Sequence, residues 1–191
     1  MHSLTLPAPA LTTMRQKIRE LLWLVARTRS RHESVVARQL TMKGLSAFLP
    51  WTWGWSSKGG RRHALQVPMF PGYVFVGING LAGEPDKEQH ICALRTAGLV
   101  SFLGQLPGRP PSTVCPGEVE SLMVLSQSQL VARPHNFFVK GQAVRVVAGP
   151  LAGAEGFVNR IRGHMRLVVR VMVMGRAVSV ELNEAQLEPV T

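Results

Sequence analysis

The sequence has few acidic residues and little cysteine. Its 191 residues contain 11 aspartates and glutamates against 22 lysines and arginines, which gives a net charge of +11. Such an excess favours partners with negative charge, either nucleic-acid phosphates or an acidic protein surface. Two cysteines, Cys92 and Cys115, are too few for a disulfide framework or a four-cysteine zinc site. We interpret each as a small buried hydrophobic residue in a reducing compartment.

Motifs of catalysis are also absent. The chain contains no glycine-rich nucleotide loop, no Gly-x-Ser-x-Gly, no His-Glu-x-x-His and no Cys-x-x-Cys. The six histidines never occur at metal-ligand spacing. Glu118 and Glu120 fall on different faces of an expected helix, unlike a cooperating carboxylate pair. We predict a binding protein that is not an enzyme and uses no cofactor or metal.

Long apolar segments are missing too. No run approaches the roughly 20 apolar residues that a membrane-spanning helix needs. Residues 1–22 lack the apolar core and cleavage site of a signal peptide. We therefore expect a cytoplasmic protein with no membrane segment. Met14 is a second candidate start, so we interpret residues 1–20 as a loose N-terminal extension.

The basic residues are concentrated near the front of the chain. Between Arg15 and Arg62 there are eleven basic residues and two acids, a net charge of +9 over about a quarter of the sequence. From Arg133 onward there are eight basic and four acidic residues. The front stretch is either a nucleic-acid-binding face or a solvated helix face with a basic loop, and charge alone leaves both open.

Patterning predicts an N-terminal domain of mixed helices and strands. A strand over residues 22–27 precedes a helix that begins at a capping box, Ser30 to Glu33, and ends at Gly44. A loop with three tryptophans then leads to a hairpin tip at residues 58–62. The other elements expected here are strands at 47–49 and 99–103 and helices at 85–97 and from Pro116. Their order favours helices on an antiparallel sheet.

The strand expected from Tyr73 is apolar on both faces. Val74, Val76 and Ile78 would point to one side, whereas Tyr73 and Phe75 would point to the other. Either a second layer of the fold covers this aromatic face, or the face is an exposed patch for a partner. The residues alone leave both alternatives open.

The C-terminal part changes to short strands and glycine turns. Residues 127–138 lose periodicity and contain Pro134, so we place a linker there. Five strands without a helix then predict a small β-barrel. They are expected at residues 143–147, 156–161, 167–174, 178–182 and 187–190. Valine-rich strands disfavour refolding of this part into helices.

Together these features resemble the NusG and RfaH family of bacterial transcription elongation factors. The motifs that carry the resemblance are, in chain order, Trp23 with Glu33, a basic hairpin, Phe70-Pro71-Gly72-Tyr73-Val74-Phe75-Val76, Val100-Ser101-Phe102-Leu103-Gly104, Gly141 to Val146, Gly149-Pro150, Gly156, and Met174 to Leu182. The resemblance implies an α+β fold. It would comprise an NGN-type α/β sandwich with an antiparallel sheet over residues 21–126, a linker over 127–138, and a five-stranded SH3-like KOW barrel over 139–191.

The resemblance also implies a function and sites. The protein would bind RNA polymerase, suppress pausing or termination, and recruit a partner through its KOW domain. Contacts to the clamp helices of the largest polymerase subunit would be Phe70, Pro71, Gly72, Tyr73 and Phe75, and contacts to the gate loop would be Gln89, His90 and Ile91. The non-template DNA strand would meet Arg29, Arg31, His32, Arg38, Gln39, Lys43 and Arg95. The KOW partner, either a ribosomal protein that acts as a Nus factor or Rho, would meet Ala154, Val173, Met174 and Arg176.

Some positions depart from the family pattern. The family has aromatic residues at the positions of Leu151, Ala154 and Met174, and RfaH has tyrosine at that of Arg27. We therefore expect a specialised, monomeric paralogue, associated with the nucleoid through RNA polymerase. We also expect its aromatic face to be open in the free protein. The alternative is a ribosome-associated or RNA-binding KOW protein, which would concentrate its basic residues in the tail.

Overall fold

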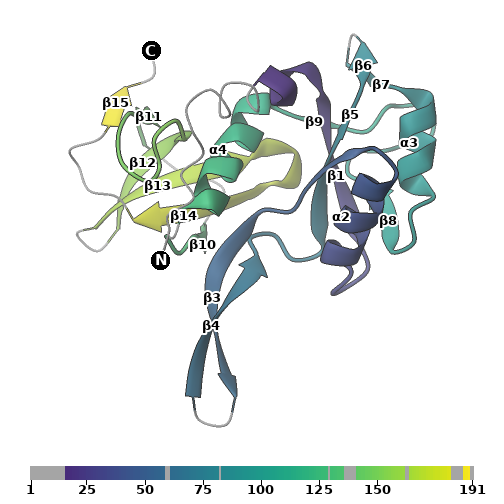
Figure 1. Ribbon diagram of the computed structural model, residues 1–191. Helices are drawn as coiled ribbons and strands as arrows, with labels where there is room; N and C mark the ends of the chain where they lie inside the picture. Colours follow the sequence, from purple (N-terminus) through teal and green to yellow (C-terminus); the bar gives the residue numbers. More distant parts are fainter. Residues whose placement is uncertain are drawn as a thin grey trace.

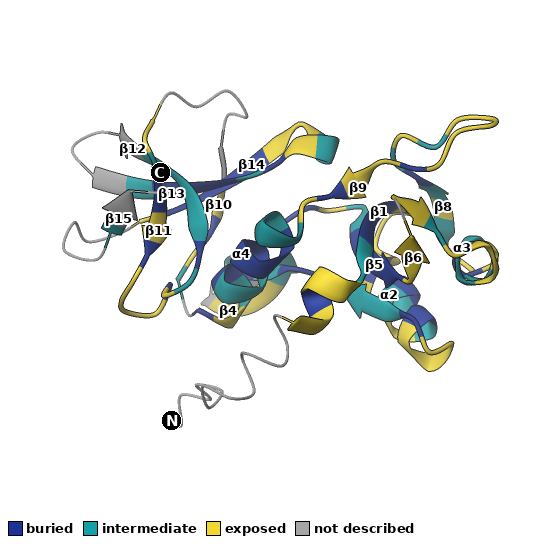
Figure 2. Ribbon diagram, turned by 90° about the horizontal axis from the view of Figure 1, so that it is seen from above, coloured by how far each residue is buried: buried dark blue, intermediate teal, exposed yellow. Residues whose placement is uncertain are grey.

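The computed structural model describes residues 16–58, 61–81, 83–128, 130–135, 141–161, 164–181 and 187–189. An N-terminal part with a sheet and helices lies against a C-terminal antiparallel sheet (Figure 1). Helix α4 (Pro116–Gln127) lies between the two (Figure 2). None of the helices in the described residues is long and apolar enough to cross a membrane.

The N-terminal sheet has the order β2-β5-β1-β8, with β9 paired to β1, and its neighbouring strands are antiparallel. The strands are β1 (Leu22–Thr28), β2 (Ser46–Phe48), β5 (Tyr73–Ile78), β8 (Leu99–Phe102) and β9 (Thr113–Val114). Helices α2 (Glu33–Met42) and α3 (Lys87–Leu94) contribute Val36, Leu40 and Ala93 to the core on one face. That core contains Val74, Val76 and Ile78, as the alternation predicts.

The other face of the sheet is covered as well. Trp23, Val25 and Phe75 belong to a second core, to which α4 contributes Val119 and Leu122. The indole N–H of Trp23 donates to the Ile18 carbonyl at 2.9 Å. Of the two alternatives for the aromatic face, the second layer is therefore the one present in this structure.

The capping box predicted at the start of α2 is wrong. The residue at the N-cap is His32, and its side chain makes no capping hydrogen bond. Glu33 is buried instead, and its carboxylate accepts from the Gly72 N–H at 2.7 Å. The Gly72 carbonyl accepts from the Thr28 N–H at 2.9 Å. The local capping box is replaced by a long-range hydrogen bond of Glu33. The reason is that the turn before β5, with Gly72 at φ +85°, brings the Gly72 N–H to the start of the helix.

The predicted tryptophan loop is also wrong. Trp51, Trp53 and Trp55 lie in β3 (Trp51–Lys58), which pairs along its whole length with β4 (Arg61–Pro68). The resulting ribbon projects from the body of the protein (Figure 1). Residues 59 and 60 of the expected tip lie outside the described residues, and the hairpin itself is present because Lys58 pairs with Arg61. A smaller ribbon joins β6 (Gly80–Leu81) to β7 (Glu84–Pro85).

The C-terminal sheet has six strands in the order β10-β14-β13-β12-β11-β15. They are β10 (Arg133–His135), β11 (Ala143–Val146), β12 (Glu155–Ile161), β13 (His164–Val171), β14 (Arg176–Glu181) and β15 (Leu187–Pro189). β10, from the segment expected to be a linker, pairs with β14. The expected third strand stops at Val171, where the 3-10 turn η1 (Met172–Met174) begins. The β-sheet architecture predicted for this part is confirmed.

The hydrogen bond of Glu33 to Gly72 generates a first prediction. Glu33→Ala leaves the Gly72 N–H without its acceptor, so the free energy of unfolding should fall by about 1–3 kcal/mol. Denaturant titration followed by circular dichroism measures this change. The control is Glu88→Ala, an exposed glutamate in the first turn of α3, which should stay within about 0.5 kcal/mol of the native protein. Equal stabilities of the two variants would contradict this role of Glu33.

Candidate functional site

The residues predicted to bind the polymerase clamp lie together on one turn and one strand. Phe70 and Phe75 are almost fully buried, with 2% and 0% exposure, and their ring centroids are 6.1 Å apart in a tilted arrangement. Phe48 packs on Phe75 from the neighbouring strand at 6.0 Å. Pro71 is exposed, and Tyr73 is half-buried. The cluster is therefore a preformed aromatic surface, and Phe48 and the Pro71 to Tyr73 rim are its parts that reach solvent.

The C-terminal sheet covers this rim. The guanidinium of Arg176 lies over the Tyr73 ring, 4.9 Å from its centroid, which is a cation–π arrangement. Val173 and Met174 pack against the same core as Phe70 and Phe75. Three of the four residues predicted to bind the KOW partner thus belong to the contact with the N-terminal part. The fourth, Ala154, is fully buried in that core.

The expectation that the aromatic face is open is therefore wrong in this structure. It assumed that only a helical form of the C-terminal part could present an apolar cover. The sheet does so without refolding, because the η1 turn between β13 and β14 places Val173 and Met174 against the core. The arginines of β13 do not interfere, since Arg166 pairs with Glu181 at 2.7 Å and Arg170 stacks on the Phe157 ring at 3.7 Å.

Two hydrogen bonds join α4 to the C-terminal sheet. The Ser121 hydroxyl oxygen accepts from the Glu155 N–H at 2.9 Å, and the Glu118 carboxylate accepts from the Met172 N–H at 3.1 Å. Burial raises the pKa of Glu118, while the N–H groups of Met172 and Cys115 and the charge of Arg170 partly offset this effect. The raised pKa means that the charged carboxylate is disfavoured in the closed arrangement, in which the C-terminal sheet lies against the N-terminal part. In an open arrangement, with the two parts separated, solvent would surround the carboxylate.

The packing between the two parts leaves space. A cavity of about 200 Å³ lies between α4 and the C-terminal sheet, lined by residues that include Glu118 and Met172. Cys115, the residue before α4, also lines it and is exposed, so its predicted burial is wrong. Its position at the junction of the two parts explains the difference. Nothing in the sequence around Glu118 and Ser121 marked them as residues that join two domains.

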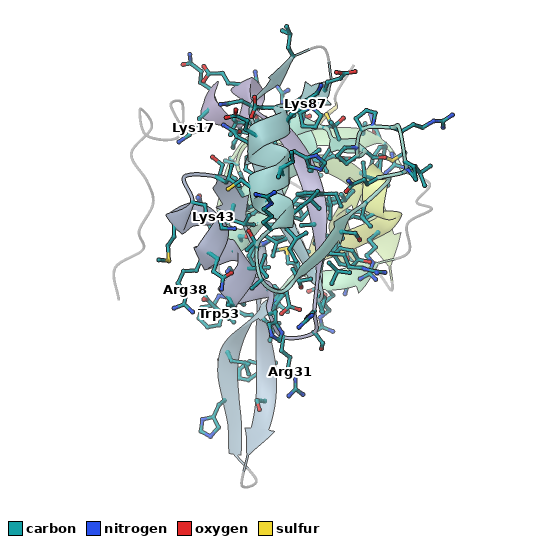
Figure 3. The ribbon with its side chains drawn as sticks, turned by 90° about the vertical axis from the view of Figure 1, so that its right-hand side faces the viewer. Lys17, Arg31, Arg38, Lys43, Trp53 and Lys87 are labelled. Carbon is teal, nitrogen blue, oxygen red and sulfur yellow. The ribbon has the colours of Figure 1, made fainter. Side chains whose placement is uncertain are left out.

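The residues predicted to meet DNA surround the start and the outer face of α2. Arg29, Arg31, His32, Arg38 and Arg95 are exposed, and Gln39 is half-buried. Figure 3 shows Arg31, Arg38 and Lys43 from the side of this helix. Lys43 differs from the others, because its ammonium donates to the Thr96 hydroxyl at 2.8 Å and to the Cys92 carbonyl at 3.1 Å. It therefore ties α2 to α3.

The residues predicted to touch the gate loop have different environments. The Gln89 side chain accepts from the Asn79 N–H at 2.8 Å, so it supports a turn. The His90 ring packs on Phe102 with centroids 5.1 Å apart, and burial lowers the pKa of His90. Ile91 is 48% exposed. Ile91 is thus the member of this group that presents an apolar side chain to solvent.

The described residues hold no cluster of three or more histidine, cysteine, aspartate or glutamate side chains that could bind a metal ion. Their exposed side chains include several arginines and a few large apolar residues, Trp53 and Trp55 of β3 among them. The alternating Trp51, Trp53 and Trp55, with the period of a strand, were the signal for this hairpin that the sequence interpretation missed.

Comparison with known proteins agrees with this architecture. The family model described as "Transcription termination factor nusG" matches residues 21–123. The transcription termination/antitermination proteins NusG of Thermus thermophilus and Escherichia coli K12 are 31% and 33% identical to the chain, over 68% and 69% of it and 71% and 70% of their own lengths. The solved structure titled "Domain interaction in Thermotoga maritima NusG" has a TM-score of 0.50 and 19% identity, covering 91% of this chain and 99% of that one, a likeness of fold. The chain therefore belongs to the NusG family.

Proposed function

We propose that this protein is a transcription elongation and antitermination factor that binds RNA polymerase through its aromatic face. Members of its family are transcription termination and antitermination factors rather than enzymes. In this proposal the clamp helices of the polymerase pack on Tyr73, with Phe70 and Phe75 as the rigid floor. Ile91 on α3 is the contact to the gate loop on the other side of the cleft. A bridge between clamp and gate would disfavour the paused state of the polymerase.

The observation that carries the proposal is the contact between two surfaces that the family resemblance assigns to two different partners. Tyr73, a predicted polymerase contact, lies under Arg176, a predicted partner contact. Both surfaces are apolar, and in this structure each one shields the other from solvent. One face cannot hold both the C-terminal sheet and the polymerase. Polymerase binding therefore requires the two parts to separate, which also frees the C-terminal sheet for its partner.

The basic surface around α2 completes the proposal. Its exposed arginines would contact phosphates of the non-template DNA strand in the transcription bubble, and such contacts position a protein without reading sequence. Lys43 is left out of this role because it bonds to α3. The partner of the C-terminal sheet is proposed to be a ribosomal protein that acts as a Nus factor, or Rho. Suppression of pausing or termination would follow from the bridge and from that partner.

Tyr73 provides the test of the aromatic face. Tyr73→Ala should weaken binding to core RNA polymerase at least ~30-fold, because an anchoring aromatic contributes on the order of 2 kcal/mol or more. Tyr73→Phe keeps the ring and should bind within a few-fold of the native protein. Surface plasmon resonance with immobilised polymerase measures both. Tyr73→Ala also removes the ring under Arg176, which should make separation of the two parts easier. Weaker polymerase binding of this variant therefore cannot result from a tighter contact between the two parts. Native affinity of Tyr73→Ala would refute this face as the dock.

Glu118 tests the closed arrangement. Glu118→Ala removes the acceptor of the Met172 N–H and should speed the exchange of the Met172 and Glu155 amides in the full-length protein. Glu118→Gln keeps an acceptor and removes the buried charge, so it should exchange no faster than the native protein. Nuclear magnetic resonance measures these rates, with Val168 as an internal control because its strand pairs with Ser179. Unchanged Met172 exchange in Glu118→Ala would contradict the interface.

The salt dependence of binding tests two exposed arginines, Arg31 just before α2 and Arg38 within it. The double variant Arg31→Ala/Arg38→Ala should bind elongation complexes more weakly but core polymerase without nucleic acid equally well. Its affinity should also depend less on salt, by a slope of about 0.7–0.9 for each phosphate that the variant no longer neutralises. Arg109→Ala, at an exposed arginine in the loop before β9, is the control. Identical slopes for the native protein and the double variant would exclude the DNA contact.

A further inference from the structure

The β3–β4 hairpin exposes aromatic surface that the contacts proposed above do not use. Trp53 and Trp55 are 36% and 68% exposed, and their spacing of two residues places them on the same face of the ribbon. Gln66 and Ala64 lie opposite them on β4. Leu65, also 36% exposed, faces the other side. The ribbon that carries this tryptophan face, Trp53 with Trp55, projects from the body of the protein (Figure 1).

The root of the hairpin is firmly held. The Trp51 N–H donates to the Ser126 hydroxyl of α4 at 3.2 Å. The Thr52 hydroxyl is buried, accepts from the Ala132 N–H at 2.8 Å and lies 3.3 Å from the Ala132 carbonyl. The Met69 N–H donates to the Pro50 carbonyl at 2.8 Å. A ribbon fixed in this way can hold two indoles in place. A ligand that stacks on them therefore loses little binding free energy to the ordering of these side chains.

The sequence that contains the hairpin is basic. No acidic residue occurs between Glu33 and Glu84, and the basic residues of that stretch are Arg38, Lys43, Lys58, Arg61 and Arg62. Three of these five flank the turn of the hairpin, where Lys58 pairs with Arg61. An apolar aromatic surface beside positive charge matches a ligand with flat rings and negative charge. Nucleic acid with unpaired bases has both properties.

Geometry favours a single strand over a duplex. Side chains two residues apart on a strand are separated by about 6.6–6.8 Å, twice the ~3.4 Å rise between the stacked base pairs of a duplex. Two indoles at this separation can each stack on a base of an extended strand. In a duplex the faces of the bases are occupied by their neighbours. Figure 3 shows Trp53 beside the root of the hairpin, in the same view as Arg31 and Arg38 of the basic surface.

We propose that the tryptophan face binds single-stranded DNA, with one base stacked on Trp53 and another on Trp55. Stacking on the two indoles does not depend on the proposed function. The choice of DNA over RNA rests on that function, in which the basic surface of α2 already meets an unpaired DNA strand. The hairpin would then extend the same contact along the strand.

The test uses the full-length protein and a fluorescently labelled dT20 oligonucleotide, without polymerase. Trp53→Ala/Trp55→Ala should weaken binding at least ~30-fold, since each stacked base contributes about 1–3 kcal/mol. Trp53→Phe/Trp55→Phe keeps two rings and should retain most of the affinity. Leu65→Ala, on the opposite face of the ribbon, is the matched control and should bind like the native protein. Fluorescence anisotropy measures binding, and circular dichroism at the assay temperature checks that each variant is folded, because Trp53 is only 36% exposed.

Three further ligands separate the sources of the signal, namely rU20, duplex DNA of 20 base pairs, and core RNA polymerase. The proposal expects dT20 to bind more tightly than the duplex and at least as tightly as rU20, with polymerase binding unchanged in the double alanine variant. Native dT20 affinity in that variant would overturn the proposal, as would tighter binding of the duplex or of rU20. Loss of polymerase binding alone would make the tryptophan face a protein contact instead. Because dT20 binding is measured without polymerase, its failure is distinguishable from failure of the proposed function.

Discussion

One hydrophobic core connects the two parts of this protein. It begins at Trp23, Val25 and Phe75 on the N-terminal sheet, passes the inner side of α4, and continues into the valines of the C-terminal sheet. Full burial of a large apolar side chain stabilises a fold by about 1.5–3 kcal/mol. The side chains at the junction therefore contribute to the stability of the closed arrangement as well as to that of each part. Whether the aromatic face is available to a partner depends on this one core.

The closed arrangement sets a cost for binding. If only a fraction of the molecules is open, the apparent affinity for a partner on the aromatic face falls by that fraction. A preference for closure of about 2.8 kcal/mol would weaken binding about 100-fold. Two features of the junction oppose closure, namely the cavity beside α4 and the half-buried Glu118 carboxylate, whose pKa is raised by burial. A partner with a large apolar surface can offset a cost of this size.

Sequence patterns predicted the elements that depend on short-range regularity. The alternation in β5 assigned Val74 and Phe75 to opposite faces, and the valine-rich strands indicated the C-terminal sheet. The capping box failed because Glu33 finds its partner 39 residues away, at Gly72. The tryptophan strand was missed because Gly54 and the serines that follow resemble a loop, whereas pairing with β4 decides the conformation. The roles of Glu118 and Ser121 depend on another domain, which no local pattern encodes.

The departures from the family pattern acquire a physical meaning in the closed arrangement. Ala154 has no exposed surface and lies in the shared core, together with Leu151. An aromatic side chain at position 154 would need space that a close-packed core does not offer, and the packing between the parts would have to change. Met174 has an unbranched side chain that adapts to the surface it meets, which a rigid ring does not. Ala154 and Met174, which the resemblance assigns to contact with an external partner, are thus suited to an internal one. In the proposed function the surface that contacts Tyr73 has two occupants in turn, and the residues of this chain fit the intramolecular one.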